Sequence, residues 1–304
     1  MTAIVPAGSH TSHTTLECSD LQATKRFYRD VLGLRAIQHE PHAMLVIGEN
    51  GHFAAVLEVR KLSAQPRSNH HARPVPTPRD VDAAHDRISG LASEHAVRSI
   101  ERPRRESIGG VESYGFALED RDGNWWRISE NAGPFGALPI GPNYLIPGDG
   151  AMGDPAIGSV LPAGPISYAM LQSRDLKHAQ PFYADFLGLP LEARGEGTLC
   201  SQTAYGANLV IVEEPDVFPQ PVLNHTGITV HGPPHLVDLV HEEAVAQQER
   251  FGILRVKAIT DVHATHSFYF QDRDTNWWEI EVLDRHEHPW HKVVREATSP
   301  ATTV

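Results

Sequence analysis

The chain has few cysteines, no excess of positive charge and no long apolar run, and each absence excludes a class of protein. Only two of its 304 residues are cysteines, without CxxC spacing, which excludes a disulfide framework and a cysteine-rich zinc site. The net charge of −12 argues against a nucleic-acid partner, because phosphate binding needs a basic face. No segment approaches the roughly 20 apolar residues that span a bilayer, and residues 1–12 lack the pattern of a secretory signal. We therefore expect a cytoplasmic protein with no membrane or nucleic-acid partner.

Histidine, by contrast, is plentiful, with 19 residues. A neutral imidazole is the commonest protein ligand for transition metals. We therefore expect a metal site, and the place of each histidine in the fold decides which of them form it.

The second half of the chain repeats the first. Residues 20–34 and 175–189 are identical at eight of fifteen positions, and both segments end in Leu-Gly-Leu. Asn-His at 69–70 recurs at 224–225, and Asp-Arg-Asp-Gly-Asn-Trp-Trp from residue 120 recurs from residue 272 with Thr in place of Gly. Three blocks in the same order, at offsets of 155 or 152 residues, indicate a duplication.

Each half contains two units with the same order of elements. In the first unit, residues 12–18 are predicted as a strand, and a helix then begins after Asp20 and ends at Gly33. Strand patterns follow, and a turn-linked pair of strands closes the second unit. The pattern predicts an α+β fold of four βαβββ modules, at residues 9–64, 66–132, 164–216 and 222–284. The N-terminal half is then 1–132, a Gly/Pro-rich linker is 133–163, the C-terminal half is 164–284, and a polar tail is 285–304.

These motifs resemble the vicinal oxygen chelate superfamily, which includes glyoxalase I, fosfomycin-resistance proteins and extradiol ring-cleaving dioxygenases. The resemblance is carried by the Asp-Leu helix that ends in Leu-Gly-Leu and by the later Asp-x-Asp-Gly-Asn turn. It covers roughly residues 9–132 and 164–284. It implies that pairs of modules close into cupped mixed sheets, so that four modules form two half-barrel pairs, as in type I extradiol dioxygenases. The motifs specify the fold more than the reaction, because the same modules host isomerases, lyases, dioxygenases and binding proteins.

In this superfamily the metal ligands come from the first and last strands of the modules. The first-strand ligand lies seven residues before the Asp of Asp-Leu, and the last-strand ligand follows the Asp-x-Asp-Gly-Asn turn. Carried over to this sequence, the resemblance assigns a first-strand position in every module and a last-strand position in modules two and four. The first-strand positions, in order of module, are His13, His70, Tyr168 and His225. The last-strand positions are Arg127 and Glu279.

The pairing of the modules decides which of these positions form a site. Two imidazoles and one carboxylate on one face leave three metal positions open, as oxygen chemistry requires. Pairing within each half gives incomplete sets, with Arg127 or Tyr168 in place of a ligand. Pairing module one with module four gives a complete set of His13, His225 and Glu279. This cross-pairing, which leaves the second cup without a metal site, is similar to that of the hydroquinone-cleaving branch of ring-cleaving dioxygenases.

Residues 268–279 resemble the extradiol signature, although residues 273 and 275 depart from its Pro and Gly. The resemblance implies that Tyr269 lies beside the metal and hydrogen-bonds the substrate. The family places an acid/base histidine shortly before this segment, but no histidine here has the family spacing. His263 and His266 are therefore both candidates for that role.

The direction of the Glu58 side chain decides between two kinds of chemistry. Residues 55–58, Ala-Val-Leu-Glu, resemble the strand that supplies a fourth ligand in glyoxalase I. If Glu58 points into the cup, the site has four protein ligands, which favours an isomerase or lyase with Ni(II) or Zn(II). If Glu58 is an exposed edge-strand carboxylate, the site has three.

The resemblance implies first an extradiol-type dioxygenase that uses Fe(II), with Mn(II), Ni(II) or Zn(II) as alternatives. Its partners would be a small dihydroxylated aromatic of the catechol or hydroquinone class and dioxygen, and the chain could form a homo-oligomer. The two alternatives are a glyoxalase-like metal-dependent isomerase or lyase, and a non-catalytic small-molecule binding or resistance protein.

Overall fold

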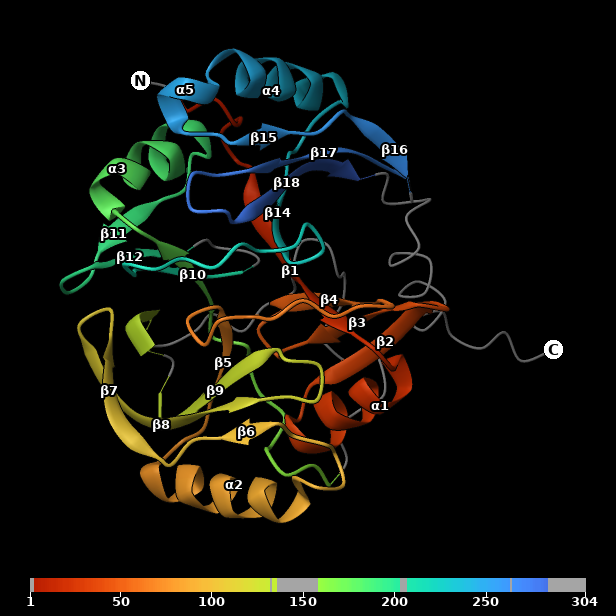
Figure 1. Cartoon of the computed structure of the whole chain (residues 1–304), viewed down its shortest axis with the longest axis vertical. Helices are drawn as coiled ribbons and strands as arrows, with labels where there is room; N and C mark the ends of the chain where they lie inside the picture. The colour runs from red at the N-terminus through yellow and green to blue at the C-terminus, as the bar shows by residue number, and fades with distance from the viewer. Residues whose placement is uncertain (1–2, 132, 136–157, 203–206, 263, 284–304) are drawn as a thin grey trace.

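The computed structural model describes residues 3–131, 133–135, 158–202, 207–262 and 264–283 (Figure 1). Most of the predicted linker and the whole predicted tail lie outside these residues, as does His263. Among the described helices, none is long and apolar enough to cross a membrane.

Each predicted module range contains a first strand, a helix and a set of later strands. The elements of module one are β1 (His10–Cys18), α1 (Leu21–Arg26), the π-helix η1 (Phe27–Val31), β2 (Arg35–Glu40), β3 (Ala43–Ile47) and β4 (Phe53–Glu58). Those of module two are β5 (His70–Pro74), α2 (Pro78–Leu91), β6 (Ser99–Ile100), β7 (Arg104–Ile108), β8 (Val111–Glu119) and β9 (Trp125–Ser129), and the short helix η2 (Gly133–Phe135) follows.

The second half repeats this plan. The elements of module three are β10 (Ala169–Ser173), α3 (Leu176–Pro181), the π-helix η3 (Phe182–Phe186), β11 (Leu191–Ala193), β12 (Thr198–Ser201) and β13 (Leu209–Glu213). Those of module four are β14 (His225–Thr229), α4 (His235–Ala246), α5 (Gln248–Phe251), β15 (Arg255–Val256), β16 (Thr260–Val262), β17 (Thr265–Gln271) and β18 (Trp277–Leu283). The predicted α+β fold of βαβββ-like modules is confirmed.

The strands form two mixed sheets, each of nine strands within the described residues, and each sheet joins modules from both halves. The first sheet has the order β15-β17-β18-β14-β1-β4-β3-β2, with β16 beside β17. The second has the order β11-β12-β13-β10-β5-β9-β8-β6, with β7 beside β8. The joints between modules are the antiparallel pairs β1–β14 and β10–β5. Module one is therefore paired with module four, and the predicted cross-pairing of the modules is confirmed.

The two largest hydrophobic cores follow a different division from the sheets, whereas a smaller one joins modules two and three through Ala72, Tyr168 and Val210. One core is built from modules one and two and contains Tyr28 and Trp126, whose rings lie 5.3 Å apart. The other is built from modules three and four and contains Phe182 and Trp278. In Figure 1 the helices α4 and α2 lie at opposite ends of the molecule, with the two sheets between them. Each half is thus held together by its helices, while the sheets join the halves.

The repeated Asp-x-Asp turn ties the two modules of one half together. The carboxylate of Asp122 accepts hydrogen bonds from Ser19 N at 2.9 Å, Ser19 Oγ at 2.7 Å and Thr24 Oγ1 at 2.5 Å. Ser173 Oγ donates to Asp274 at 2.7 Å in the second half. The motif is therefore structural, and it fixes the first helix of one module against the last hairpin of the next.

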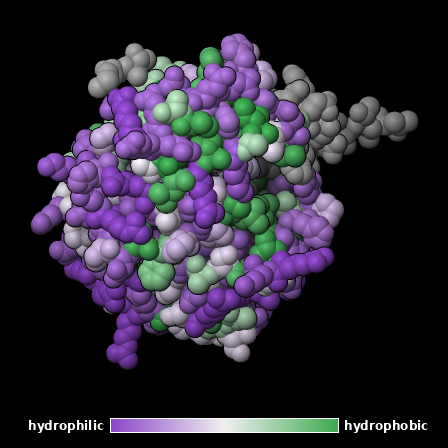
Figure 2. All heavy atoms as spheres, turned by 45° about the horizontal axis from the view of Figure 1, so that its top comes forward, coloured by the Kyte–Doolittle hydropathy of each residue, from purple (hydrophilic) through white to green (hydrophobic). Residues whose placement is uncertain are grey.

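The surface is largely hydrophilic, with small groups of hydrophobic side chains on the face shown in Figure 2. The exposed large hydrophobic residues of the described chain are Phe218, Leu223, Leu239, Val245, Leu254 and Val262. Two of these, Leu223 and Val262, also line a cavity inside the first sheet.

Candidate metal centre

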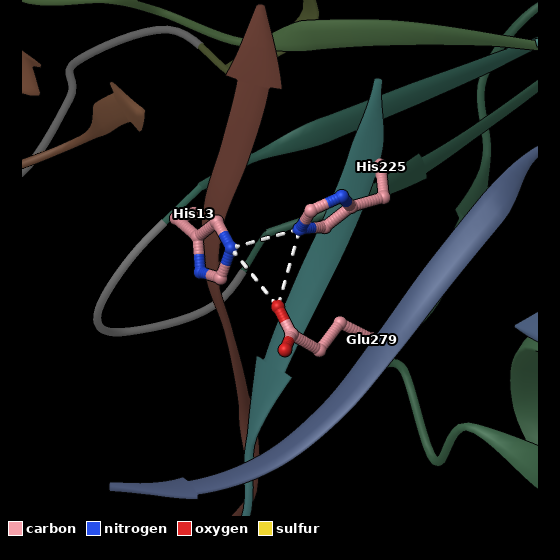
Figure 3. A group of neighbouring side chains, drawn as sticks. All are labelled: His13, His225 and Glu279. Carbon is pink, nitrogen blue, oxygen red and sulfur yellow. Dashed lines mark hydrogen bonds and ion pairs between the residues drawn. The ribbon is translucent and has the colours of Figure 1, made fainter. Parts of the chain in front are cut away.

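Three neighbouring strands of the first sheet bring two imidazoles and one carboxylate together (Figure 3). His13 lies on β1, His225 on β14 and Glu279 on β18, and these strands are hydrogen-bonded neighbours. The Nε2 atoms of His13 and His225 are 3.4 Å apart, and Glu279 Oε2 lies 3.6 Å from the first and 3.1 Å from the second. All three side chains are buried, and among the described residues they form a group that could hold a metal ion.

The donor atoms of this group fit a divalent metal. Bonds of about 2.1 Å at right angles separate neighbouring donor atoms by about 3 Å, close to the observed 3.1–3.6 Å. Two neutral imidazoles and one carboxylate on one face suit non-haem Fe(II) and leave three positions open. The structure thus brings together the three ligands that the sequence predicted, although their metal binding stays a prediction.

Gly227 has no side chain, and this leaves the space that the imidazole of His13 occupies. The two residues face each other across the β1–β14 pair. A Cβ atom on Gly227 would lie 2.1 Å from His13 Cε1 and 2.4 Å from His13 Nδ1. Our sequence reasoning missed Gly227, but the repeat contained a signal. The corresponding residue of module two, 155 positions earlier, is Ala72.

Glu281 lies behind His13. Its Oε1 accepts hydrogen bonds from Ser12 Oγ at 3.0 Å and Thr229 Oγ1 at 2.8 Å, and lies 3.5 Å from His13 Nδ1. Because Nδ1 and Nε2 lie on different sides of the ring, this carboxylate orients the imidazole and does not share a metal with it. The sequence reasoning missed Glu281 as well, although the period-two spacing of Glu279 and Glu281 places both on one face of β18.

His225 is oriented by its own backbone. Its Nδ1 lies 2.8 Å from the carbonyl oxygen of Val222, and only an N–H can donate to that oxygen. When the ring is neutral, Nε2 therefore carries the lone pair that a metal needs, and it points at the other two candidate ligands.

The group is electrostatically prepared for a cation. Burial alone would lower the pKa of His13, but the carboxylates of Glu279 and Glu281 outweigh burial and raise it to about 9. Burial alone would raise the pKa of Glu279, but hydrogen bonds with His13 and His225 hold it well below its usual range. The carboxylate is therefore ionised at neutral pH, and a metal must compete with the proton on His13.

Tyr269 lies beside the ligands. It is directly opposite Glu279 in the β17–β18 pair, and its ring is 5.0 Å from that of His225. Burial, and secondarily the charge of Glu279, raise the pKa of Tyr269 well above its usual range. The side chain is therefore a neutral phenol that can donate a hydrogen bond.

These side chains face a cavity of about 250 Å³. Its apolar lining comes from Ala43, Ala55, Leu57, Leu223 and Val262, and its polar lining includes the three candidate ligands and Tyr269. The cavity is therefore the candidate substrate site.

The remaining candidates lie elsewhere. His266 is on the opposite face of β17, where its Nδ1 lies 2.6 Å from Asp261 and its Nε2 lies 2.9 Å from Asp238 of α4. It is therefore not brought to the cavity, because strand residues alternate between faces and Tyr269 occupies the inward one. His263 lies outside the described residues.

Glu58 does not join the group. On β4, Ala55 and Leu57 line the cavity, so Glu58 points to the other face of the strand. Its carboxylate lies 3.8 Å from His42 Nδ1 and is partly exposed. The four-ligand alternative is therefore wrong for Glu58, and the group has three candidate ligands.

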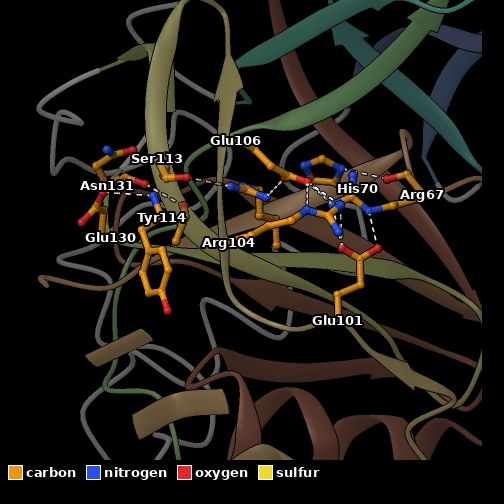
Figure 4. Close-up of polar contacts among 11 residues, drawn as sticks. Arg67, His70, Glu101, Arg104, Glu106, Ser113, Tyr114, Glu130 and Asn131 are labelled. Carbon is orange, nitrogen blue, oxygen red and sulfur yellow. Dashed lines mark hydrogen bonds and ion pairs between the residues drawn. The ribbon is translucent and has the colours of Figure 1, made fainter. Parts of the chain in front are cut away.

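The second cup contains a cation where the first has a carboxylate. Arg127 is buried and forms an ion pair with Glu106. His70 Nδ1 lies 2.9 Å from the carbonyl oxygen of Arg67 (Figure 4). The ring of Phe135 packs 6.1 Å from that of Tyr168. Within the described residues, Arg127 thus stands where Glu279 stands in the first cup.

Comparison with known proteins agrees with this fold. Residues 10–128 match the Glyoxalase/Bleomycin resistance protein/Dioxygenase superfamily. Similar solved structures include a "putative dioxygenase" from Bacillus subtilis subsp. subtilis str. 168, with 13% identity and a TM-score of 0.57 over 95% of this chain and 90% of that chain. Glyoxalase I from Zea mays has 14% identity and a TM-score of 0.58 over 96% and 98%. No curated protein sequence matches the chain.

At these identities, similarity to the solved structures shows the fold alone. The family match covers residues 10–128, in the first half of the chain, and the second half repeats the motifs and the order of elements of that half.

Proposed function

We propose that the protein is an extradiol-type dioxygenase that opens the ring of a dihydroxylated aromatic of the catechol or hydroquinone class. The proposal includes Fe(II) as the metal and dioxygen as the second substrate. Its main support is the convergence of His13, His225 and Glu279, because this donor set suits Fe(II) and leaves three positions, enough for dioxygen and for either both oxygens of a catechol or one oxygen of a hydroquinone. Fe(II), when bound, would supply the electron transfer between the diol and dioxygen that ring opening needs.

The residues around the cavity have separate roles in this proposal. His13, His225 and Glu279 would hold the metal, and Glu281 keeps the imidazole of His13 in position. The phenol of Tyr269 donates a hydrogen bond to a substrate oxygen and does not compete for the metal. The apolar wall of Ala55 and its neighbours excludes water from the reacting ring.

The two alternative functions have less support. A glyoxalase-like isomerase would use a fourth protein ligand, and Glu58, the residue expected to supply it, lies on the other face of β4. A binding protein without chemistry would not need three metal donors buried together.

One experiment separates the three functions. The purified protein is loaded with Fe(II) under argon and mixed with air-saturated catechols and hydroquinones, while oxygen uptake and the absorbance of ring-opened products are recorded. Glu279→Ala serves as the control. Absence of uptake with every diol would refute the dioxygenase. Turnover of a glutathione hemithioacetal would then support the isomerase, and a metal-free chain with the same Tm in chelator would support the binding protein.

A further inference from the structure

A diol that binds at the metal position must lose a proton, and a group beside the cavity must accept it. The oxygen binds a metal more strongly as an anion than as a hydroxyl, so the hydroxyl proton passes to a neighbouring base. Because the pKa of Tyr269 is raised well above its usual range, its phenol donates a proton at neutral pH and does not accept one. The carboxylate of Glu281 already accepts two hydrogen bonds. His266, a candidate for this role from the sequence, lies on the other face of β17.

Besides the imidazoles of the two candidate ligands, the described residues that line the cavity include the imidazole of His39. This side chain is half-buried and lies on β2. It does not belong to the group of ligand atoms that lie within 4.8 Å of one another, so it faces the space that a substrate would occupy. An imidazole is suited to accepting and returning a proton near neutral pH, because its usual pKa is about 6.5.

His39 and Tyr269 reach the cavity from opposite sides of the ligand strands. In the first sheet, the three strands that carry candidate ligands, β18, β14 and β1, lie between β17 on one side and β4, β3 and β2 on the other. Because residues of both β17 and β2 line one cavity, the sheet curves around it. A ring bound at the metal position would therefore lie between a phenol that donates a hydrogen bond and an imidazole that can accept a proton.

The strand β2 has a β-bulge at His39. It pairs with β3 through Gln38 and Met44 and next through Glu40 and Ala43, so the register shifts at His39. Consecutive residues of a regular strand point to opposite faces, yet His39 and Glu40 both line the cavity. A bulge inserts one extra residue and bends the strand, and bulges are common beside active sites, where they redirect a side chain. The edge of the sheet is therefore shaped at the point where His39 meets the cavity.

The repeat shows that this hairpin does not need the bulge. The residue 155 positions after His39 is Arg194. Its backbone N donates to Thr198 O at 3.0 Å and extends the regular register of the β11–β12 pair. Residues 39–43 and 194–198 are equally long, so loop length does not force the difference. The bulge and the imidazole thus occur together in the module that supplies His13, and module three has neither at the equivalent place.

We propose that His39 is the catalytic base that accepts a proton from the diol as it binds. The inference rests on the proposed function. The O–H bond of one substrate hydroxyl breaks, its electron pair stays on the oxygen, and the proton bonds to a ring nitrogen of His39. After ring opening, the imidazole returns this proton to the product. Tyr269 keeps its own proton throughout and donates only a hydrogen bond.

The first test counts protons and does not depend on turnover. Fe(II)-loaded protein under argon is titrated with catechol and with hydroquinone by calorimetry, in two buffers of different ionisation enthalpy, which gives the number of protons released for each diol bound. Because His39 retains the proton in the wild type, His39→Gln should release roughly one more proton to the solvent. Equal release by the two proteins would overturn the role of His39 and leave the dioxygenase proposal standing. Failure of both diols to bind would overturn both.

The matched control is His42→Gln. His42 belongs to the same hairpin, but its side chain is 78% exposed and lies 3.8 Å from Glu58, which points away from the cavity. His39→Gln should keep the metal and lose turnover by roughly 10²- to 10⁴-fold, whereas His42→Gln should match the wild type in turnover and proton release. Wild-type turnover in His39→Gln would refute the proposal, as would a change of proton release in Glu40→Gln alone.

Chemical rescue separates a base from a structural side chain. Imidazole added to His39→Ala should restore turnover in proportion to its concentration, because the vacated space opens on the cavity and the added base can occupy it. Imidazole should leave the turnover of the wild type unchanged. No rescue of His39→Ala would attribute the loss to the structure of β2 and overturn the assignment of His39 as the base.

Discussion

Replacing Gly227 with alanine should remove the metal from the protein while leaving the fold intact. The added Cβ would lie 2.1 Å from His13 Cε1, whereas unbonded carbon atoms need about 3.5 Å. The imidazole must therefore retreat by about 1.4 Å. Metal–ligand distances tolerate only about 0.2 Å, so His13 can no longer reach the position that it shares with His225.

The expected loss of metal affinity is at least 10²-fold, because changes to groups behind a ligand already cost about 10- to 100-fold. The strand itself should tolerate the change, since alanine is less costly than glycine in a strand interior. The second sheet shows this directly, because Ala72 occupies the corresponding position of β5.

Metal content after desalting, and competition with a chelator of known affinity, measure the loss, while circular dichroism follows the fold. The matched control is Ala72→Gly, which should bind metal like the wild type. Wild-type affinity in Gly227→Ala would refute the steric reasoning. Unfolding of the variant would contradict the claim that the strand accepts alanine.

The other predictions concern the same group. Glu281→Gln should weaken metal binding roughly 10- to 100-fold, measured by chelator competition, and wild-type affinity would remove Glu281 from the site. Because the pKa of His13 is raised to about 9, its proton competes with the metal below that pH. The affinity for the metal should therefore rise roughly tenfold per pH unit between 6.5 and 9 and then level off. A metal affinity that does not change with pH would contradict a protonated His13. Tyr269→Phe should keep the metal but lose turnover by roughly 10²-fold. A variant with wild-type turnover would show that the phenol takes no part in the reaction. His225→Ala should abolish metal binding and His70→Ala should leave it intact, with metal analysis deciding, and the reverse result would place the site in the other cup.

The sequence was sufficient to predict the modules and their cross-pairing. The repeated blocks marked the modules, and the pairing followed from which ligand sets were complete, with Arg127 and Tyr168 excluding the alternatives. The β1–β14 joint confirms that reasoning. The prediction of the pairing succeeded because only one pairing of modules gave two imidazoles and a carboxylate, which is the donor set that a metal site of this kind requires.

The supporting residues were harder to predict because they depend on register. Nothing in the sequence shows that Gly227 is opposite His13, since the two strands come from opposite ends of the chain. Likewise His266 and Tyr269 both precede Glu279, and only the alternation of β17 places Tyr269 inward and His266 against Asp238. Side-chain direction flips with a shift of one residue, so such assignments need the observed pairing.

The joint between β1 and β14 has a consequence for the synthesis of the protein on the ribosome. His13 and His225 are 212 positions apart, so the first half emerges with one of the three ligands, well before the other two. Until β14 is synthesised, β1 lacks one neighbour and exposes unpaired backbone groups, which can template pairing with another chain. The helices of the first half can already pack on their own core during this interval. Completion of the metal group therefore reports that the last module has docked, and a chain truncated before Glu279 cannot form it.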